Sequence, residues 1–312
     1  MSKSIVKIIF FGTSDFALPA LEALKNEGYD IVAVVTAPDK PVGRKQILTP
    51  PPIKVAAQKL GLPVLQPKKL KNLNPETWTL KPDLGIVAAY GKLIPPEIFN
   101  LPEYGTLNIH PSLLPKYRGP SPIQTAILNG DTETGVTIMK VDEDMDHGDI
   151  VATGNWQLAI GNAYQEIHDQ LAKFGAELLI KTLPDYLAGK IKPRPQDHTR
   201  ATYTHKFNTE DGEIKSDDTV ETASSKIRAL NPEPGTYYWI YQDKKKSRLK
   251  ILEAQLPSNL ETRLTDENHG KLSMINNFPA LQLKNGYIIL KTVQLEGKRP
   301  VSGQDFARRY FK

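Results

Sequence analysis

The sequence has 312 residues, of which 39% are hydrophobic, and a formal net charge of +5, so it offers enough material for two hydrophobic cores. It has no apolar run near the ~18 residues that a membrane-spanning helix needs and no secretory signal pattern at its N-terminus, so we expect a cytoplasmic protein without membrane contact. The absence of cysteine excludes disulfides, thiolate catalysis and thiolate metal ligands.

The N-terminal part alternates predicted strands and helices. Residues 5–11 form a continuous apolar run that ends at Gly12, and apolar residues then recur at helical spacing over residues 16–24. A second buried strand follows at residues 31–36, and this order predicts a βαβ unit with a parallel sheet. Because Gly12 stands without the G-x-G-x-x-G spacing, a nicotinamide or flavin cofactor has no support.

A long polar stretch, residues 36–54, follows the second strand and is expected to be a loop. Lys40, Arg44 and Lys45 lie in it among five prolines. The stretch is either an ordinary surface loop or a basic arm that reaches a phosphate backbone, and in the second case Arg44 and Lys45 lie at its tip.

Two later strands end in loops rich in proline and glycine. Residues 84–88 lead into a turn at residues 91–94, which is either structural or ligand-binding. In the next strand, Asn108 and His110 project from the same face because they are two residues apart, and Pro111 ends the strand. An open α/β sheet binds ligands outside the carboxyl ends of its strands, so Asn108 and His110 are candidates for such a site.

An acidic run follows the next predicted strand. Asp142, Asp144 and Asp146 have the alternate spacing of a calcium-binding loop. The run departs from that motif at His147, which replaces its glycine, and at Thr153, which replaces its bidentate glutamate. A working histidine instead needs a partner that fixes its tautomer, and Asp146 is the carboxylate that we expect to orient the imidazole of the candidate site.

The C-terminal part changes in pattern. An amphipathic helix is predicted from residue 164 to residue 189, and residues 190–205 lose its periodicity and are typical of a linker. A helix at residues 220–230 precedes five short strand candidates between residues 237 and 295, which suggest a small OB-like barrel.

We therefore predict an α/β fold in two domains. Residues 1–189 form a Rossmann-like, mostly parallel sheet with helices on both faces, and residues 206–312 form the OB-like β-barrel. Most of the positive excess lies in the C-terminal part. It indicates either a surface for a polyanion such as nucleic acid or a solvated face with surplus lysines.

The candidate residues at the strand end have the chemistry of acyl transfer. The Asn108 amide can donate to a developing oxyanion, and His110, if Asp146 holds its far nitrogen, can accept a proton from a nucleophile. There is no cysteine and no G-x-S-x-G motif, so we expect a substrate amine to attack a carried acyl group directly. Without further information, two satisfied polar residues at a strand end explain the pattern equally well.

Two motifs carry a family resemblance. The stretch N-I-H-P-S-L-L-P-K-Y-R-G-x-x-P at residues 108–122, followed by D-x-G-D at residues 146–149, resembles the signature of the formyltetrahydrofolate-dependent formyltransferase family. Further segments, including FFGTSDFALPAL, VAAYGKLIP and IRALNPEPG, are similar to the two-domain branch of that family that acts on methionyl-tRNA.

The resemblance implies a reaction and its site. The reaction is transfer of the formyl group of 10-formyltetrahydrofolate to the α-amino group of methionyl initiator tRNA, by a monomer and without a metal. The matching catalytic positions are Asn108, His110 and Asp146, and the role of His110, as proton acceptor or as electrostatic stabiliser, is left open. The positions that match tetrahydrofolate contacts are Ser112, Leu113, Leu114 and Pro115, with the pterin-pocket backbone at Gly91, Lys92, Leu93 and Ile94.

The resemblance also bears on the nucleic acid. It implies that the basic loop, with Lys40, Arg44 and Lys45, grips the tRNA acceptor stem and that the C-terminal barrel binds tRNA. Asp144 and His147 depart from the family's usual residues beside Asp146, which leaves the local electrostatics open. The alternatives are a formyltransferase for amino-sugar nucleotides, an inactive RNA-binding protein on the same scaffold, and a folate hydrolase.

Overall fold

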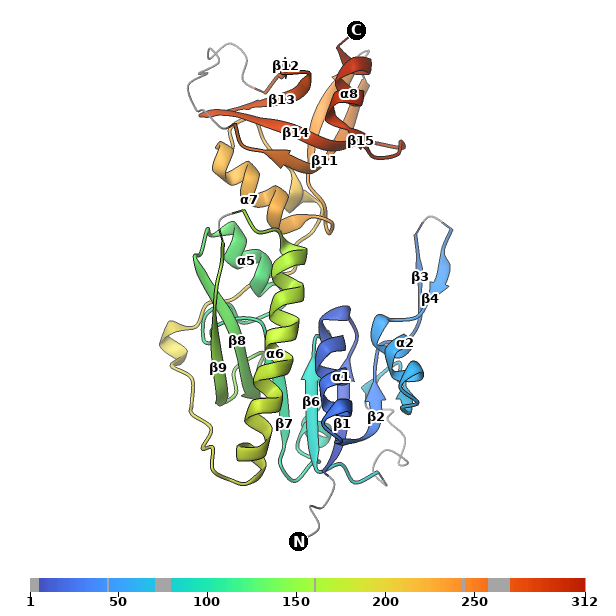
Figure 1. The fold of residues 1–312 in the computed structure, drawn as a ribbon, viewed down its shortest axis with the longest axis vertical. Helices are drawn as coiled ribbons and strands as arrows, with labels where there is room; N and C mark the ends of the chain where they lie inside the picture. Colours follow the sequence, from blue (N-terminus) through green and yellow to red (C-terminus); the bar gives the residue numbers. More distant parts are fainter. Residues whose placement is uncertain are drawn as a thin grey trace. The chain divides into compact units, whose positions relative to one another are not determined.

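The computed structural model of the protein describes residues 6–43, 45–70, 80–159, 161–242, 245–257 and 270–311 (Figure 1). The chain divides into two compact units. The first comprises Met1–Pro122, Thr132–Leu158 and Gln165–Thr204, and the second comprises Ile123–Asp131, Ala159–Tyr164 and His205–Lys312. The predicted linker thus lies almost wholly in the first unit. The division into one domain at residues 1–189 and another at residues 206–312 stays a prediction.

A seven-stranded sheet forms the centre of the first unit. Its order is β5-β2-β1-β6-β7-β8-β9. The strands from β5 to β7 are parallel, whereas β8 and β9 pair antiparallel. Their bounds are β1 (Lys7–Gly12), β2 (Asp30–Val35), β5 (Val64–Leu65), β6 (Leu84–Ala88), β7 (Thr106–His110), β8 (Glu133–Lys140) and β9 (Ile150–Gln157).

Both faces of this sheet are covered. Successive residues of β1 point to opposite faces, and Phe10 and Phe11 are both fully buried. The helices α1 and α6 lie side by side over one face, where the rings of Phe16 and His168 meet edge to face (Figure 1). The helical segments of the first unit are α1 (Leu18–Asn26), α2 (Pro52–Lys59), α4 (Pro96–Phe99), α6 (Tyr164–Leu187) and the single turns Asp15–Ala17 and His198–Arg200, whereas α5 (Pro122–Leu128) falls almost wholly in the second unit.

Helix α6 packs tightly on the strand that carries the candidate residues. A Cβ at Gly175 of α6 would lie 2.8 Å from the Ile109 side chain of β7, so only glycine allows this approach. Ile109 therefore points into the core, and its neighbours Asn108 and His110 point to the opposite face of β7.

The polar stretch at residues 36–54 is not a plain loop. It contains a hairpin in which β3 (Lys40–Val42) pairs antiparallel with β4 (Ile47–Thr49), and the hairpin projects from the sheet (Figure 1). The loop prediction was wrong because three-residue strands are too short to show an alternating pattern. Val42, Ile47 and Leu48 are more than half exposed, at 55%, 61% and 64%.

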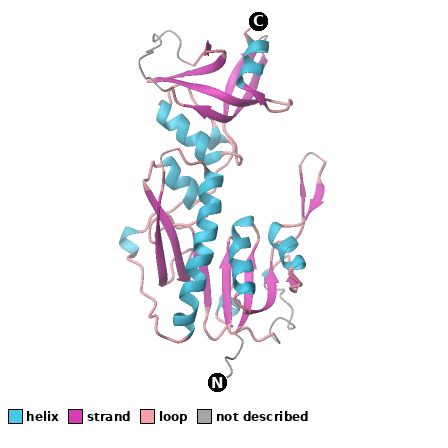
Figure 2. Cartoon of the chain, viewed as in Figure 1, coloured by secondary structure: helices cyan, strands magenta, loops and turns pink. Residues whose placement is uncertain are grey.

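The second unit holds an antiparallel sheet with helices against it (Figure 2). The sheet order is β10-β11-β14-β13-β12, with β15 beside β14. The Tyr238 hydroxyl of β10 donates to the carbonyl of Gly270, near β12, at 2.6 Å and so links the two ends of this order. The elements are α7 (Val220–Leu230), β10 (Tyr237–Gln242), β11 (Lys245–Gln255), β12 (Leu272–Ile275), β13 (Phe278–Leu283), β14 (Gly286–Leu295), β15 (Val301–Ser302) and α8 (Gly303–Tyr310).

The predicted fold class is confirmed, with a mostly parallel sheet among helices and a C-terminal antiparallel unit. The core of the second unit includes Ile227 of α7, Leu249 of β11 and Phe306 of α8. Helix α8 and strand β15 lie beyond residue 295, where we predicted neither a helix nor a strand from the sequence. Among the described residues, no helix is both long and apolar enough to cross a membrane.

Candidate active site

The candidate residues lie at the carboxyl end of β7. Asn108 pairs with Val87 of β6 on one side and with Met139 of β8 on the other, so it lies on an interior strand of the sheet. The His110 side chain is buried and Asn108 is half-buried. A strand end between two neighbours holds polar side chains in fixed positions, as a reaction site requires.

The structure brings Asn108, His110 and Asp146 together. Asn108 Nδ2 donates to Asp146 Oδ1 at 3.2 Å, and His110 Nδ1 lies 3.5 Å from Asp146 Oδ2. The backbone N–H of Gly119 donates to the same Oδ2 at 2.8 Å. Both oxygens of the carboxylate are therefore engaged, and Asp146 fixes the amide and the imidazole at once.

The second nitrogen of the imidazole is also engaged. His110 Nε2 lies 2.9 Å from the carbonyl oxygen of Tyr117. A carbonyl only accepts, so Nε2 carries the hydrogen of this bond. Of the two roles that the sequence left open for His110, proton acceptor and electrostatic stabiliser, the first needs a free nitrogen, and in this arrangement Nε2 is not free.

Comparison with known proteins identifies the family. Residues 6–183 match the family described as "Formyl transferase", and residues 206–310 match its C-terminal domain. The chain belongs to the formyl transferase family. A methionyl-tRNA formyltransferase of Chloroflexus aurantiacus is 42% identical over 96% of this chain and 95% of its own length.

Two solved structures share the fold of this chain. HypX from Aquifex aeolicus in complex with tetrahydrofolic acid matches with a TM-score of 0.67 and 17% identity, over 99% of this chain and 48% of HypX. An N-formyltransferase from Helicobacter canadensis, in complex with folinic acid and dTDP-3-aminofucose, has a TM-score of 0.68 and 20% identity, over 91% of this chain and 98% of its own.

The segment that the formyl transferase resemblance assigns to tetrahydrofolate alternates in burial. Ser112 and Leu114 are buried, whereas Leu113 and Pro115 are half-buried. The Ser112 hydroxyl donates to the carbonyl of Lys116 at 2.7 Å, so it stabilises the loop itself. Leu113 and Pro115 are the more accessible of the four.

The turn after β6 lies at the neighbouring strand end, because β6 pairs directly with β7. Gly91, Lys92 and Leu93 are exposed, with Leu93 77% exposed, and Ile94 is half-buried. An apolar side chain with that exposure is available to a ligand. The turn thus offers accessible backbone and apolar surface beside the β7 edge.

The basic arm is only partly described. Lys40, in β3, and Lys45 are exposed on the projecting hairpin. Arg44, which the sequence predicts at the tip, lies outside the described residues. In the part of the chain that the structure describes, no group of histidines and carboxylates has the arrangement of a metal site.

The second unit presents an aromatic and basic face on the β10–β11 pair. Trp239 of β10 pairs with Arg248 of β11, and Tyr241 pairs with Lys246. Lys246 Nζ lies 4.3 Å from the Trp239 ring centre, and the guanidinium of Arg248 lies 5.1 Å from it. Tyr241 is 66% exposed. Aromatic rings interleaved with cations are typical of surfaces that bind single-stranded nucleic acid.

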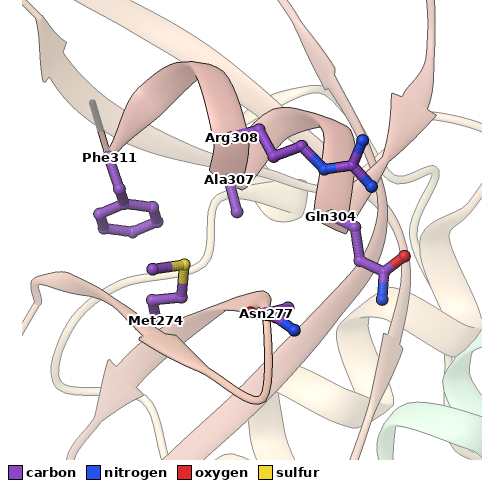
Figure 3. A pocket seen from close by; sticks show the side chains of 6 residues that line it. All are labelled: Met274, Asn277, Gln304, Ala307, Arg308 and Phe311. Atoms are coloured by element: carbon purple, nitrogen blue, oxygen red, sulfur yellow. The ribbon is translucent and has the colours of Figure 1, made fainter.

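A cavity of about 370 Å³ lies elsewhere in the second unit, between the β12–β13 turn and α8 (Figure 3). None of the site residues predicted from the sequence lines it. Its lining residues are Met274, Asn277, Gln304, Ala307, Arg308 and Phe311.

Sequence reasoning missed two main-chain groups of the site. These are the carbonyl of Tyr117 and the N–H of Gly119, which fix His110 and Asp146. Main-chain groups have no residue-type signature. Gly119 belongs to the family motif, however, and its φ of +104° favours glycine, so the motif itself was the available signal.

Proposed function

We propose that this chain transfers the formyl group of 10-formyltetrahydrofolate to the α-amino group of methionyl initiator tRNA, as a cytoplasmic monomer. The observation that carries the proposal is the contact of Asn108 and His110 with Asp146 at the end of β7. The full-length similarity to a methionyl-tRNA formyltransferase supports it. Without that cluster, the similarity would describe only a scaffold.

The amide of Asn108 is the donor for the formyl oxygen. One N–H of its Nδ2 is bonded to Asp146, and the amide has a second N–H for a ligand. As the methionine nitrogen attacks the formyl carbon, the oxygen becomes an oxyanion and this hydrogen bond strengthens. Removal of one such donor costs about 10²- to 10³-fold in rate.

His110 acts by orientation rather than as the proton acceptor. Its Nε2–H is bonded to the Tyr117 carbonyl, and its Nδ1 faces the carboxylate of Asp146. Both neighbours are acceptors, so neither nitrogen is left free to take the proton of the amine. The imidazole instead holds the Asp146 carboxylate, and with it the Asn108 amide that receives the formyl oxygen.

The step balances without an added reactant. A bond forms between the methionine nitrogen and the formyl carbon, and the bond between that carbon and folate N10 breaks. The amine loses one proton and N10 gains one. No covalent intermediate with the protein is needed, in line with a chain that has no cysteine.

The two co-substrates would use different surfaces. Leu113, Pro115 and the turn at residues 91–94 offer accessible apolar and backbone groups beside β7 for the pterin of tetrahydrofolate. The lysines of the β3–β4 hairpin and the β10–β11 face offer cations and rings for tRNA. Ser112 contributes through its backbone, because its hydroxyl is bonded within the loop.

Transfer to an amino-sugar nucleotide is the main alternative. It is favoured by the fold shared with the Helicobacter canadensis protein, but 20% identity supports a common fold alone. The full-length relative at 42% identity favours tRNA. An inactive RNA-binding scaffold is disfavoured because Asn108, His110 and Asp146 are present and in contact.

The test is a transfer assay with three acceptors, namely methionine-charged initiator tRNA, the same tRNA uncharged, and an amino-sugar nucleotide. We expect product only with the charged tRNA, and Asn108→Ala should lower its rate about 10²- to 10³-fold. Asn155→Ala, which removes an exposed amide bonded to Glu133, is the matched control. Product only with the sugar nucleotide would overturn the tRNA assignment, and turnover of the folate without any amine would indicate a hydrolase.

A further inference from the structure

Arg118 is buried although it lies in the loop after β7. It is 1% exposed, and its guanidinium holds a single amide oxygen in a fork, with Nε and Nη2 at 3.1 and 2.7 Å from Gln196 Oε1. The same guanidinium donates to Tyr203 Oη at 3.2 Å. A charge this deeply buried is costly unless its N–H groups are satisfied, and these acceptors satisfy it.

Gln196 connects Arg118 to the turn that carries Asp146. Its Nε2 donates to the carbonyl of Asp146 at 2.9 Å and to the carbonyl of Gly148 at 2.8 Å. Both N–H groups and the oxygen of this amide, which is 5% exposed, are therefore used. The amide bridges the buried guanidinium and the backbone on both sides of His147.

The turn needs such a support. Asp146 has a φ of +50°, a left-handed conformation that residues with a side chain adopt mainly where their surroundings stabilise it. This conformation directs the carboxylate toward Asn108 and His110. A relaxed turn would withdraw the carboxylate from both.

A second contact runs from Arg118 to the same turn. Its Nη2 lies 2.8 Å from His198 Nδ1, which must accept because a guanidinium only donates. The ring of His198 stacks on the ring of His147, with centres 4.0 Å apart and an angle of 4°. His147 Nδ1 in turn lies 2.7 Å from Asp142 Oδ2.

The supporting residues come from a segment that is anchored to the first unit. Arg194 pairs with Ile150 at the start of β9, and the backbone N–H of Arg118 donates to the carbonyl of Thr202 at 2.8 Å. Gln196 and His198 lie between these anchors. The segment predicted as a linker thus contacts the Asp146 turn through Gln196. We call this contact, from Arg118 through Gln196 to the carbonyls of Asp146 and Gly148, the clamp.

We propose that Arg118 and Gln196 are positioning residues for the transfer reaction, and that they hold the Asp146 turn in its left-handed conformation so that Asn108 and His110 keep their orientation. The proposal rests on the proposed function for its kinetic consequence. It assigns to residues 194–202 a role in the rate of the reaction and not in the binding of either substrate.

Gln196→Glu is the decisive variant, because it keeps the shape of the side chain and an oxygen for Arg118 but replaces the donor to the two carbonyls with an acceptor. We expect kcat to fall about 10- to 100-fold, because small displacements of a reacting group have effects of this size. The KM values for both substrates should stay at the parent level. Gln58→Glu, on the exposed side of α2, is the matched control and should keep the parent kcat.

An activity-independent readout separates this proposal from the proposed function. The chain has six histidines, and the imidazole signals of His110 and His147 in NMR spectra should move in Gln196→Glu and not in Gln58→Glu. If the parent forms no product with charged tRNA, the proposed function fails, while the NMR comparison still tests the clamp. Unmoved signals would overturn the clamp whatever the activity.

Two kinetic outcomes would also overturn it. One is a folded Gln196→Glu protein with the parent kcat. The other is a loss that lies in KM or that follows the fraction of folded protein, since a merely structural role produces these. If Gln196→Glu does not fold, Arg118→Lys replaces it, because lysine keeps the charge but loses the fork, and a parent kcat in that variant rejects the proposal.

Discussion

The carboxylate of Asp146 accepts a hydrogen bond from the side-chain amide of Asn108, at 3.2 Å between Oδ1 and Nδ2. The residue proposed to bind the formyl oxygen is thus oriented by the residue that also faces the imidazole of His110. Asp146 therefore contacts both other residues of the site, and a change at this one carboxylate should affect both.

Asp146→Asn should be a folded protein with little activity. Asparagine tolerates a left-handed backbone, so the turn can persist, but the negative charge beside His110 is lost and one amide faces another at Asn108. We expect kcat to fall about 10²- to 10³-fold, as for loss of an oxyanion-stabilising group. Single-turnover transfer measures it. Asp144→Asn, two residues away and exposed, should keep the parent rate; a parent rate in Asp146→Asn instead would remove Asp146 from the site.

Gly148→Ala should lower both the thermal midpoint and kcat. An ideal Cβ at Gly148 would overlap the carbonyl oxygen of Lys140, a backbone atom that cannot move independently. Overpacking of this kind costs about 1–3 kcal/mol, and the required shift displaces the turn of Asp146. Gly28→Ala is the comparison, since Gly28 has open space and the substitution meets only the cost of its φ of +83°, far from the turn of Asp146, so kcat should stay at the parent level there. A parent midpoint and a parent kcat in Gly148→Ala would show that the overlap is relieved.

Much of the fold was predictable from the sequence because buried strands have a clear pattern. The predicted apolar run at residues 5–11 overlaps β1 (Lys7–Gly12), the run at residues 84–88 is β6, and the alternating strand of Asn108 and His110 is β7. The β3–β4 hairpin was not predictable, because its strands are three residues long and exposed. Helix α8 had a usable signal, a cap in which the Ser302 hydroxyl accepts from the N–H of Asp305.

The site, too, has residues that were predictable from the sequence and residues that were not. Asn108 and His110 share a strand face, so their spacing alone placed them together. Arg118 and Gln196 are 78 residues apart and gave no sign of contact, because a pairing of that kind depends on the tertiary fold. The carbonyl of Tyr117 was not predictable either, since every residue has a carbonyl group.

Tyr90→Phe tests a buried group at the end of β6. Among the residues that the structure describes, the Tyr90 hydroxyl has no hydrogen-bond partner, and burial raises the pKa of Tyr90 to about 12. In the unfolded chain a tyrosine ionises near pH 10, so the stability linked to this group is present below about pH 10 and is lost as the pH rises toward 12. Tyr90→Phe cannot ionise, so its urea midpoint should fall less over that range than the parent's.

At pH 8, Tyr90→Phe should match the parent or gain about 1 kcal/mol, because an unpaired hydroxyl is removed from the interior. A loss of stability at pH 8 would mean that the hydroxyl has a partner in solution. If the urea midpoint of Tyr90→Phe falls as steeply as the parent's when the pH rises from about 10 toward 12, other groups dominate the pH dependence of stability.

Lys246→Ala tests the aromatic and basic face of the second unit. Lys246 lies over the Trp239 ring and opposite Tyr241. If a tRNA phosphate replaces a counterion at this lysine, the variant should bind tRNA more weakly and the slope of log K against log salt should fall by about 1. Binding titrations at several salt concentrations measure it. Lys284→Ala, exposed between β13 and β14, is the control, and an equal slope in the two variants would exclude this face from the tRNA contact.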